Sequence, residues 1–162
     1  MTEMLPFQIN EYLIAEVLGS DFPMTVEMRL RGTPGLTEFG VMVRVSSDGT
    51  EYTRVGLDFD QEGRPTQGFV DRTLSGTSDF NGDFASIYTA DIAYLHLEGE
   101  EVSILFLLDE SSVEAFFYDG LIAMTARIFP DELSRGMALY QVEGEELRVS
   151  FFQVRALSSI WQ

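Results

Sequence analysis

The chain has 162 residues, with 27 acidic side chains against ten arginines and no lysine or cysteine, and its formal net charge is −17. This excess of negative charge argues against binding to nucleic acid or to an anionic membrane, because phosphate groups need cationic partners. It is compatible with a neutral ligand such as a sugar. The lack of cysteine excludes disulfides and thiolate metal sites, and the length and the 45% apolar content predict a single domain over residues 1–162.

Short segments of alternating apolar and polar residues recur along the chain with turn signals between them, which is typical of strands in an antiparallel sandwich. We expect strands near residues 11–18, 24–30, 39–45, 52–59, 69–70, 94–97, 103–108, 113–118, 122–128, 137–142 and 147–154. The first of these is also compatible with a short helix. Residues 73–86 are rich in Gly and Ser and are predicted to form a long loop, which Phe80 and Phe84 attach to the body of the domain. No segment has a sustained helical period, so an all-β sandwich is expected.

The most informative stretch is residues 103–130, which predicts two strands joined by Tyr118-Asp119-Gly120. Asp-Gly is a favoured hairpin dipeptide, because Gly accepts positive φ without steric cost. The apolar run that ends at Leu108 gives way to the polar cluster Asp109, Glu110, Ser111 and Ser112. After this cluster, Glu114 lies on a different face from its apolar neighbours. This arrangement would bring hydroxyls and carboxylates together, as a sugar site requires.

Three segments resemble a known family, and along the chain they keep the order that they have in that family. Residues 109–116 are Asp-Glu-Ser-Ser-Val-Glu-Ala-Phe, followed by Asp119-Gly120 and by Ile128-Phe129-Pro130. Residues 70–76 are Val-Asp-Arg-Thr-Leu-Ser-Gly, and residues 157–161 are Leu-Ser-Ser-Ile-Trp. Together they resemble the C-terminal β-sandwich of glycoside hydrolase family 32, which holds invertases, inulinases and levanases, and the resemblance covers about residues 26–161.

The resemblance implies a concanavalin-like jelly roll of two antiparallel sheets without the catalytic propeller of that family. The chain has no Asn-Asp-Pro, no Arg-Asp-Pro and no Glu-Cys segment, and it is too short to hold a propeller as well. It is therefore not expected to be an enzyme. Stand-alone sandwiches of this kind form carbohydrate-binding module family 66, so the resemblance implies a non-catalytic module that recognises terminal fructosyl units of β-fructans of the levan type. The alternative is a structural or dimerisation domain of a family 32 hydrolase that binds no sugar.

The candidate ligand-binding residues are Asp71, Arg72, Tyr94, Asp109, Ser111, Ser112, Glu114 and Tyr118. Asp71 and Arg72 would exchange charge-assisted hydrogen bonds with vicinal hydroxyls, or form an ion pair that orders the 73–86 loop. The Asp109–Ser112 cluster is more commonly a turn in which side chains cap backbone groups. Glu114 would contact sugar, or pair with Arg72 or Arg127.

Several further residues bear on ligands and partners. The two tyrosines would offer a ring face to a sugar, whereas Glu110 stands where the family has Arg, so an inherited contact there is lost or reversed in charge. Glu114 and Asp109 as a glycosidase pair are the weakest hypothesis, because both lie in one local bend. The expected partners are a β-fructan or fructose-containing oligosaccharide and a family 32 catalytic domain.

No metal or cofactor is expected. The segment Asp58-x-Asp60-x-Glu62-Gly63 imitates the start of a calcium loop, but its twelfth position is Phe69 and a polar hairpin turn is predicted instead. The single His96 has no second His or Cys to form a zinc cluster, and Trp161 is expected to close the end of the sandwich. The first ten residues lack the basic and apolar parts of a signal peptide. Membership of a fructan-degrading enzyme would nevertheless imply a secreted or cell-surface location.

Overall fold

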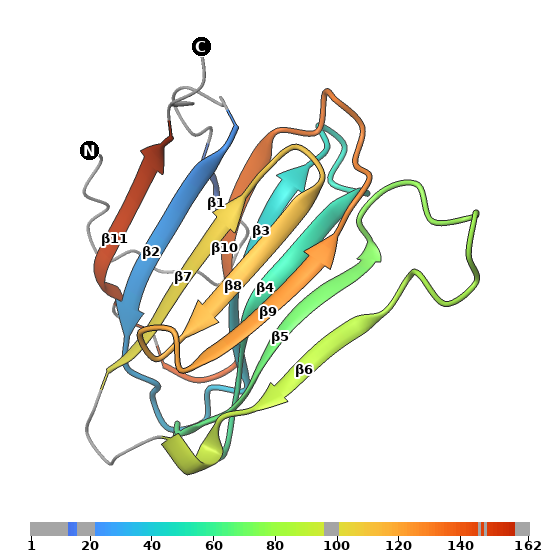
Figure 1. The fold of residues 1–162 in the computed structure, drawn as a ribbon. Coiled ribbons are helices and arrows are strands. Elements are labelled where there is room, and N and C mark those ends of the chain that lie inside the picture. Colours follow the sequence, from blue (N-terminus) through green and yellow to red (C-terminus); the bar gives the residue numbers. More distant parts are fainter. Residues whose placement is uncertain (1–12, 16–21, 96–100, 146, 148, 158–162) are drawn as a thin grey trace.

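The computed structural model describes residues 13–15, 22–95, 101–145, 147 and 149–157, and Figure 1 shows two antiparallel β-sheets packed face to face. Sheet A has six strands, in the order β1 (Leu13–Ala15), β10 (Gly136–Val142), β3 (Glu38–Val45), β4 (Tyr52–Phe59), β5 (Pro65–Leu74) and β6 (Ile87–Asp91). Sheet B has five, in the order β11 (Val149–Ala156), β2 (Met24–Leu30), β7 (Val102–Leu108), β8 (Ser112–Phe117) and β9 (Ile122–Arg127). The predicted antiparallel β-sandwich is confirmed.

The main core lies between the two sheets and follows the two-residue period of the strands. In β8, Val113, Ala115 and Phe117 are buried while Glu114 and Phe116 lie on the other face and are only partly covered. Because successive side chains of a strand point to opposite faces, each strand of sheet B offers one row to the core and one row to the outside. The outer row of sheet B is therefore available for contacts beyond the domain.

The strand prediction is wrong in two places, both near the edge of sheet A. Residues 87–91 form β6, which was missed because four of its five side chains are exposed and show no apolar alternation. Tyr94 and Leu95, predicted as the start of a strand, lie in η1, a single turn of 3-10 helix over Ala93–Leu95. Strand β5 is also longer than the two residues predicted for it. His96 and Trp161 lie outside the described residues.

A β-bulge changes the direction of side chains at the end of β3. The sequence pattern places Val41, Val43 and Val45 on one face, but the register skips a residue there, so that Met137 pairs with Val43 and Gly136 with Val45. The extra residue is Arg44, which has a φ of 51°. Val43 remains in the main core, whereas Val45 packs in a separate apolar cluster on the outer face of sheet A. Such bulges aim a side chain in a new direction, here that of Arg44.

Across the described segments, no helix is long and apolar enough to cross a membrane.

Candidate functional site

Asp71 and Arg72 are neighbours in β5, and their side chains lie on opposite faces of sheet A, as the alternation of a strand requires. The Asp71 carboxylate lies on the outer face beside Arg54 of β4. Arg54 donates to its Oδ2 from Nε at 3.0 Å and also from Nη2. Its Oδ1 accepts hydrogen bonds from the Thr73 amide at 2.9 Å and the Thr73 hydroxyl at 2.7 Å. Both oxygens of Asp71 are thus occupied within the domain.

The Arg72 guanidinium lies on the inner side of β5 and is enclosed by aromatic rings. Its Nη1 donates to the carbonyl oxygen of Arg127 in β9 at 3.0 Å. Its Cζ lies 3.8 Å from the centroid of the Phe84 ring and 4.8 Å from that of Tyr88. A cation over the face of an aromatic ring is attracted by the ring's electrons. Arg72 therefore attaches β9 to β5, and it also attaches the loop of residues 75–86, which connects β5 to β6. It does not pair with Asp71.

The Asp109–Ser112 turn is held through its backbone. The Asp109 amide donates to the Ser112 carbonyl at 2.9 Å, and the Ile128 amide donates to the Ser111 carbonyl at 2.9 Å. The Asp109 carboxylate accepts from the adjacent Glu110 amide at 2.8 Å. Of these three bonds, the one that the Asp109 carboxylate accepts is a side-chain cap of the kind expected of such a turn. Because Ser112 pairs with Arg127, the structure brings Ser111 and Ser112 close to the β9 carbonyl that Arg72 binds.

Glu114 and the two tyrosines are placed apart from that group. Glu114 lies on the outer face of sheet B, opposite Leu107 and Thr125, and among the described residues it forms no ion pair with Arg72 or Arg127. Tyr94 is 70% exposed on η1, whereas Tyr118 is 9% exposed and packs in the main core. Figure 1 shows the β7–β8 turn at one end of the sandwich, and the β8–β9 turn and η1 at the other. The eight candidate residues therefore do not converge on one site.

Arg44 is a buried cation that the sequence reasoning missed. It is 2% exposed, and its guanidinium donates to the carbonyl oxygens of Ser134 at 2.7 Å, Glu110 at 2.8 Å and Asp131 at 3.1 Å. Burial lowers the pKa of Arg44. The only available signal was an arginine within the apolar run of residues 41–45. Arg44 connects sheet A to the β7–β8 turn and to the β9–β10 connection.

The Asp60 carboxylate stabilises the polar hairpin turn that was predicted for its segment. Its Oδ1 accepts from the amides of Glu62 at 3.0 Å and Arg64 at 2.9 Å, and its Oδ2 accepts from Arg64 Nε at 2.8 Å. No group of three or more His, Cys, Asp or Glu side chains that could hold a metal occurs in the described part of the chain. The acidic segment is accounted for by turn geometry.

Two surface features were not predicted. The first is an aromatic patch of Phe80, Phe84 and Phe129, in which Phe80 lies 4.9 Å from Phe84 and 5.5 Å from Phe129 between ring centroids. Phe84 is buried, as expected of a residue that attaches the loop, but Phe80 is 58% exposed and Phe129 37%.

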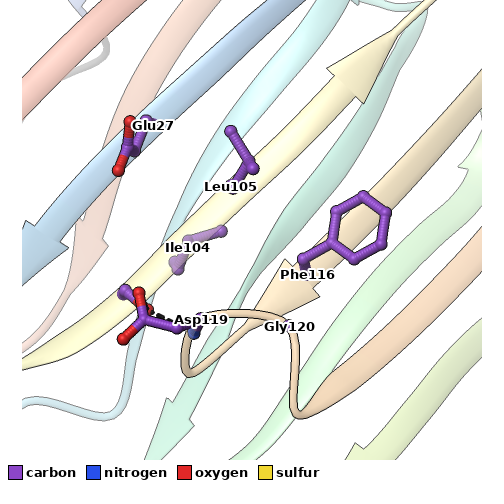
Figure 2. A pocket seen from close by; sticks show the side chains of 7 residues that line it. Glu27, Ile104, Leu105, Phe116, Asp119 and Gly120 are labelled. Carbon is purple, nitrogen blue, oxygen red and sulfur yellow. Dashed lines mark hydrogen bonds between the residues drawn. The ribbon is translucent and has the colours of Figure 1, made fainter.

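The second surface feature is a hollow of about 340 Å³ on the outer face of sheet B, drawn in Figure 2. It is lined by Glu27, Ser103, Ile104, Leu105, Phe116, Asp119 and Gly120.

A known protein family matches nearly the whole chain. A sequence model described as "Glycosyl hydrolases family 32 C terminal" matches residues 8–156. The chain belongs to this family. What matches is the C-terminal domain of these hydrolases and not their catalytic domain, so the family 32 C-terminal domain described here corresponds to the non-catalytic part of its relatives.

The relatives are enzymes much longer than this chain. A levanase of Bacillus sp. (strain L7) is 36% identical over 153 residues, which cover 94% of the chain and 16% of the levanase. An extracellular exo-inulinase of Aspergillus niger is 33% identical over 138 residues, which cover 84% of the chain and 24% of that enzyme. The family 32 C-terminal domain thus spans about a sixth to a quarter of these relatives.

Solved structures show the same fold. The exo-inulinase of Aspergillus awamori superposes with a TM-score of 0.71 at 25% identity, over 94% of this chain and 28% of that enzyme. The fructan 1-exohydrolase IIa of Cichorium intybus superposes with a TM-score of 0.73 at 17% identity, over 95% of this chain and 34% of that enzyme. The second likeness concerns the fold alone.

The Asp71 contacts make the stability of the family 32 C-terminal domain depend on pH. Burial alone would raise the pKa of Asp71, but the hydrogen bonds from Thr73 and Arg54 outweigh it and hold the pKa below its ordinary value. A carboxyl with a lowered pKa in the folded state stabilises above its unfolded pKa of about 3.9 and loses this contribution as the pH falls through the folded value. Asp71→Asn should therefore lower the free energy of unfolding by about 2 kcal/mol at pH 7. This loss should become smaller as the pH falls below about 4.

Urea unfolding of both proteins at a series of pH values between neutrality and pH 3 would measure this difference. Asp79→Asn is the matched control, because Asp79 is an exposed carboxylate in the 75–86 loop. Its effect on the free energy of unfolding at pH 7 should be small. An Asp71→Asn penalty that stayed constant down to pH 3 would contradict the ionic role of Asp71.

Proposed function

We propose that this chain is the non-catalytic accessory domain of a secreted fructan hydrolase, and that it stabilises a family 32 catalytic domain by packing against it. The aromatic patch carries the proposal. Phe80 and Phe129 expose apolar rings side by side, and the Arg127 guanidinium lies 5.5 Å from the centroid of the Phe129 ring. Exposed clusters of aromatic residues and arginine are typical of protein interfaces.

The partner is suggested by the relatives. The levanase and the exo-inulinase each carry a segment similar to this chain as a small part of a longer hydrolase, so in such an enzyme a catalytic domain would be available to cover the patch. The exo-inulinase relative is named as extracellular, which supports secretion of the enzyme to which this domain would belong. The charged residues first considered for sugar binding support the same view, because Asp71 and Arg72 are engaged in holding the sandwich together.

Recognition of a terminal fructosyl unit through the residues selected from the sequence is the second candidate function. One observation favours it, because Glu114 offers a carboxylate without an ion pair, as far as the described residues go, on the outer face of sheet B. Against it, Tyr94 lies in η1 and Tyr118 in the β8–β9 turn, and both elements are at the opposite end of the sandwich from the β7–β8 turn that holds Asp109 (Figure 1). Tyr118 is also buried. This grouping of residues has less support than the accessory role.

A chimera would test the accessory role. In the levanase of Bacillus sp. (strain L7), the segment that matches this chain would be replaced by this chain, and the half-life of levan hydrolysis would be measured at elevated temperature. The chimera should keep its activity several-fold longer than the levanase that lacks the segment. Phe80→Ser in the chimera should shorten the half-life, while it lowers the unfolding free energy of the isolated chain by no more than about 1 kcal/mol.

Tyr94→Ser is the matched control, because Tyr94 is an aromatic residue of similar size that is 70% exposed and lies in η1, at the opposite end of the sandwich from the loop between β5 and β6 (Figure 1). It should leave the half-life of the chimera unchanged. Equal half-lives of the chimera and the truncated levanase would refute the accessory role. Equal losses from Phe80→Ser and Tyr94→Ser would show that the aromatic patch is not the contact surface.

A further inference from the structure

The hollow on the outer face of sheet B is a second feature with the composition of a binding site. Its centre is a cross-strand row in which Glu27 of β2 pairs with Leu105 of β7, and Leu105 pairs with Phe116 of β8. Figure 2 shows Phe116 at one side, Glu27 at the other and Asp119 of the β8–β9 turn at the foot. Its volume of about 340 Å³ is within the range of small-molecule pockets, which are mostly apolar with a few polar groups.

The floor of the hollow is apolar and accessible. Leu105 is 38% exposed, and the Phe116 ring beside it is partly covered. Glu27 and Phe116 are two strands apart, about 10 Å at the usual strand spacing, which leaves room for one small ring between them. A ring whose C–H face rests on Leu105 and Phe116 would remove apolar surface from water.

The rim of the hollow supplies hydrogen-bond acceptors. In the described part of the chain, the contact of Glu27 with Arg29 is loose, because Arg29 Nη2 lies 3.8 Å from Glu27 Oε1, and the Glu27 side chain is 35% exposed. Asp119 is held in place by Ser103, whose hydroxyl accepts from the Asp119 amide at 2.8 Å and donates to Oδ1 at 3.3 Å. Within the described residues, no hydrogen bond reaches the second oxygen of Asp119. The two carboxylates therefore have lone pairs free for donors on a ligand.

We infer that this hollow binds one fructosyl ring of a β-fructan, an inference that rests on the proposed function for the identity of the sugar. Two carboxylates in a domain of net charge −17 disfavour an anionic ligand. Sugar hydroxyls donate charge-assisted hydrogen bonds to carboxylates, while the apolar floor contacts the ring. An organic cation is a poorer match, because Arg29 Nη2 lies 3.8 Å from Glu27 Oε1 and partly offsets the negative charge of that carboxylate. Such a site would keep the polymer close to the catalytic domain.

Calorimetric titration of the isolated chain with levan, inulin oligosaccharides, free fructose and choline would test this inference. We expect weak saturable binding of the three fructose-containing probes, with a Kd of about 10 to 1000 μM, and none of choline. Glu27→Gln and Phe116→Ala should each weaken binding about tenfold or more. Glu132→Gln is the matched control, because Glu132 is an exposed carboxylate of the β9–β10 connection and does not line the hollow. It should leave binding unchanged.

Each other outcome would overturn the inference. If a chain that still unfolds cooperatively gives no heat with any fructose-containing probe, the hollow is not a sugar site. The accessory role would then stand or fall with the chimera experiment alone. Binding lost in Glu114→Gln and kept in Glu27→Gln would move the site to the residues selected from the sequence. Choline binding that depends on Glu27 would identify the hollow as a cation site. A thermal unfolding curve for each variant distinguishes loss of binding from loss of the fold, and the half-exposed Glu27 variant should fold normally.

Discussion

Replacement of Arg44 by methionine should lower the free energy of unfolding by about 3 to 5 kcal/mol. Methionine fills a similar volume but cannot donate to the carbonyl oxygens of Ser134, Glu110 and Asp131, all of which Arg44 binds at 3.1 Å or less. Each buried acceptor left without a donor costs about 1 to 3 kcal/mol. Urea unfolding followed by far-UV circular dichroism would measure the change.

Two variants separate the causes of this effect. Arg44→Lys keeps the charge but loses the planar guanidinium that reaches three acceptors at once. Its free energy of unfolding should therefore lie between those of the wild type and Arg44→Met. Arg29→Met is the control for loss of an arginine, because Arg29 is exposed and its contact with Glu27 is loose. It should change the stability by less than about 0.5 kcal/mol. Equal effects of Arg44→Met and Arg29→Met would contradict the role assigned to the buried guanidinium.

Arg44 also shows why the sequence predicted the fold better than the site. Alternation of apolar residues placed most strands correctly, because the two-residue period is written directly in the order of residues. The bulge that turns Arg44 into the domain is not written there, since it depends on the register between β3 and β10. The edge strand β6 was missed for a related reason. Its pairing with β5 comes from backbone hydrogen bonds, and its exposed side chains carry no pattern.

The candidate site was only partly predictable for the same physical reason. The resemblance correctly indicated the family, and the capping interpretation of the Asp109–Ser112 turn holds for Asp109, whose carboxylate accepts from the Glu110 amide. Adjacent residues in a strand cannot share one site, however, and this separates Asp71 from Arg72. The hollow combines Glu27 with Phe116, which are 89 positions apart in the chain and meet only through the pairing of β2, β7 and β8. A single sequence contains no sign of that pairing.

Gly56→Ala should destabilise the domain by about 2 to 3 kcal/mol, although it adds one methyl group. On the outer face of sheet A, Tyr140, Gly40, Gly56 and Phe69 form one cross-strand row. A methyl group on Gly56 would overlap the carbonyl oxygen of Phe39 and would lie 2.8 Å from Cζ of the Phe69 ring and 2.9 Å from the Gly40 Cα. Glycine in the interior of a strand marks such a close approach. Urea unfolding would measure the loss.

Gly82→Ala is the matched control, because a methyl group there meets nothing within 4 Å. It should leave the stability unchanged or raise it by about 0.5 kcal/mol through the reduced freedom of the unfolded chain. The double variant Gly56→Ala, Phe69→Leu identifies which contact of the new methyl group causes the loss of stability. A side chain can rotate away from a new methyl group, whereas the Phe39 carbonyl is fixed by the sheet, so removing the Phe69 ring should not rescue Gly56→Ala. Full rescue would show that the aromatic ring, and not the backbone, requires glycine at this position.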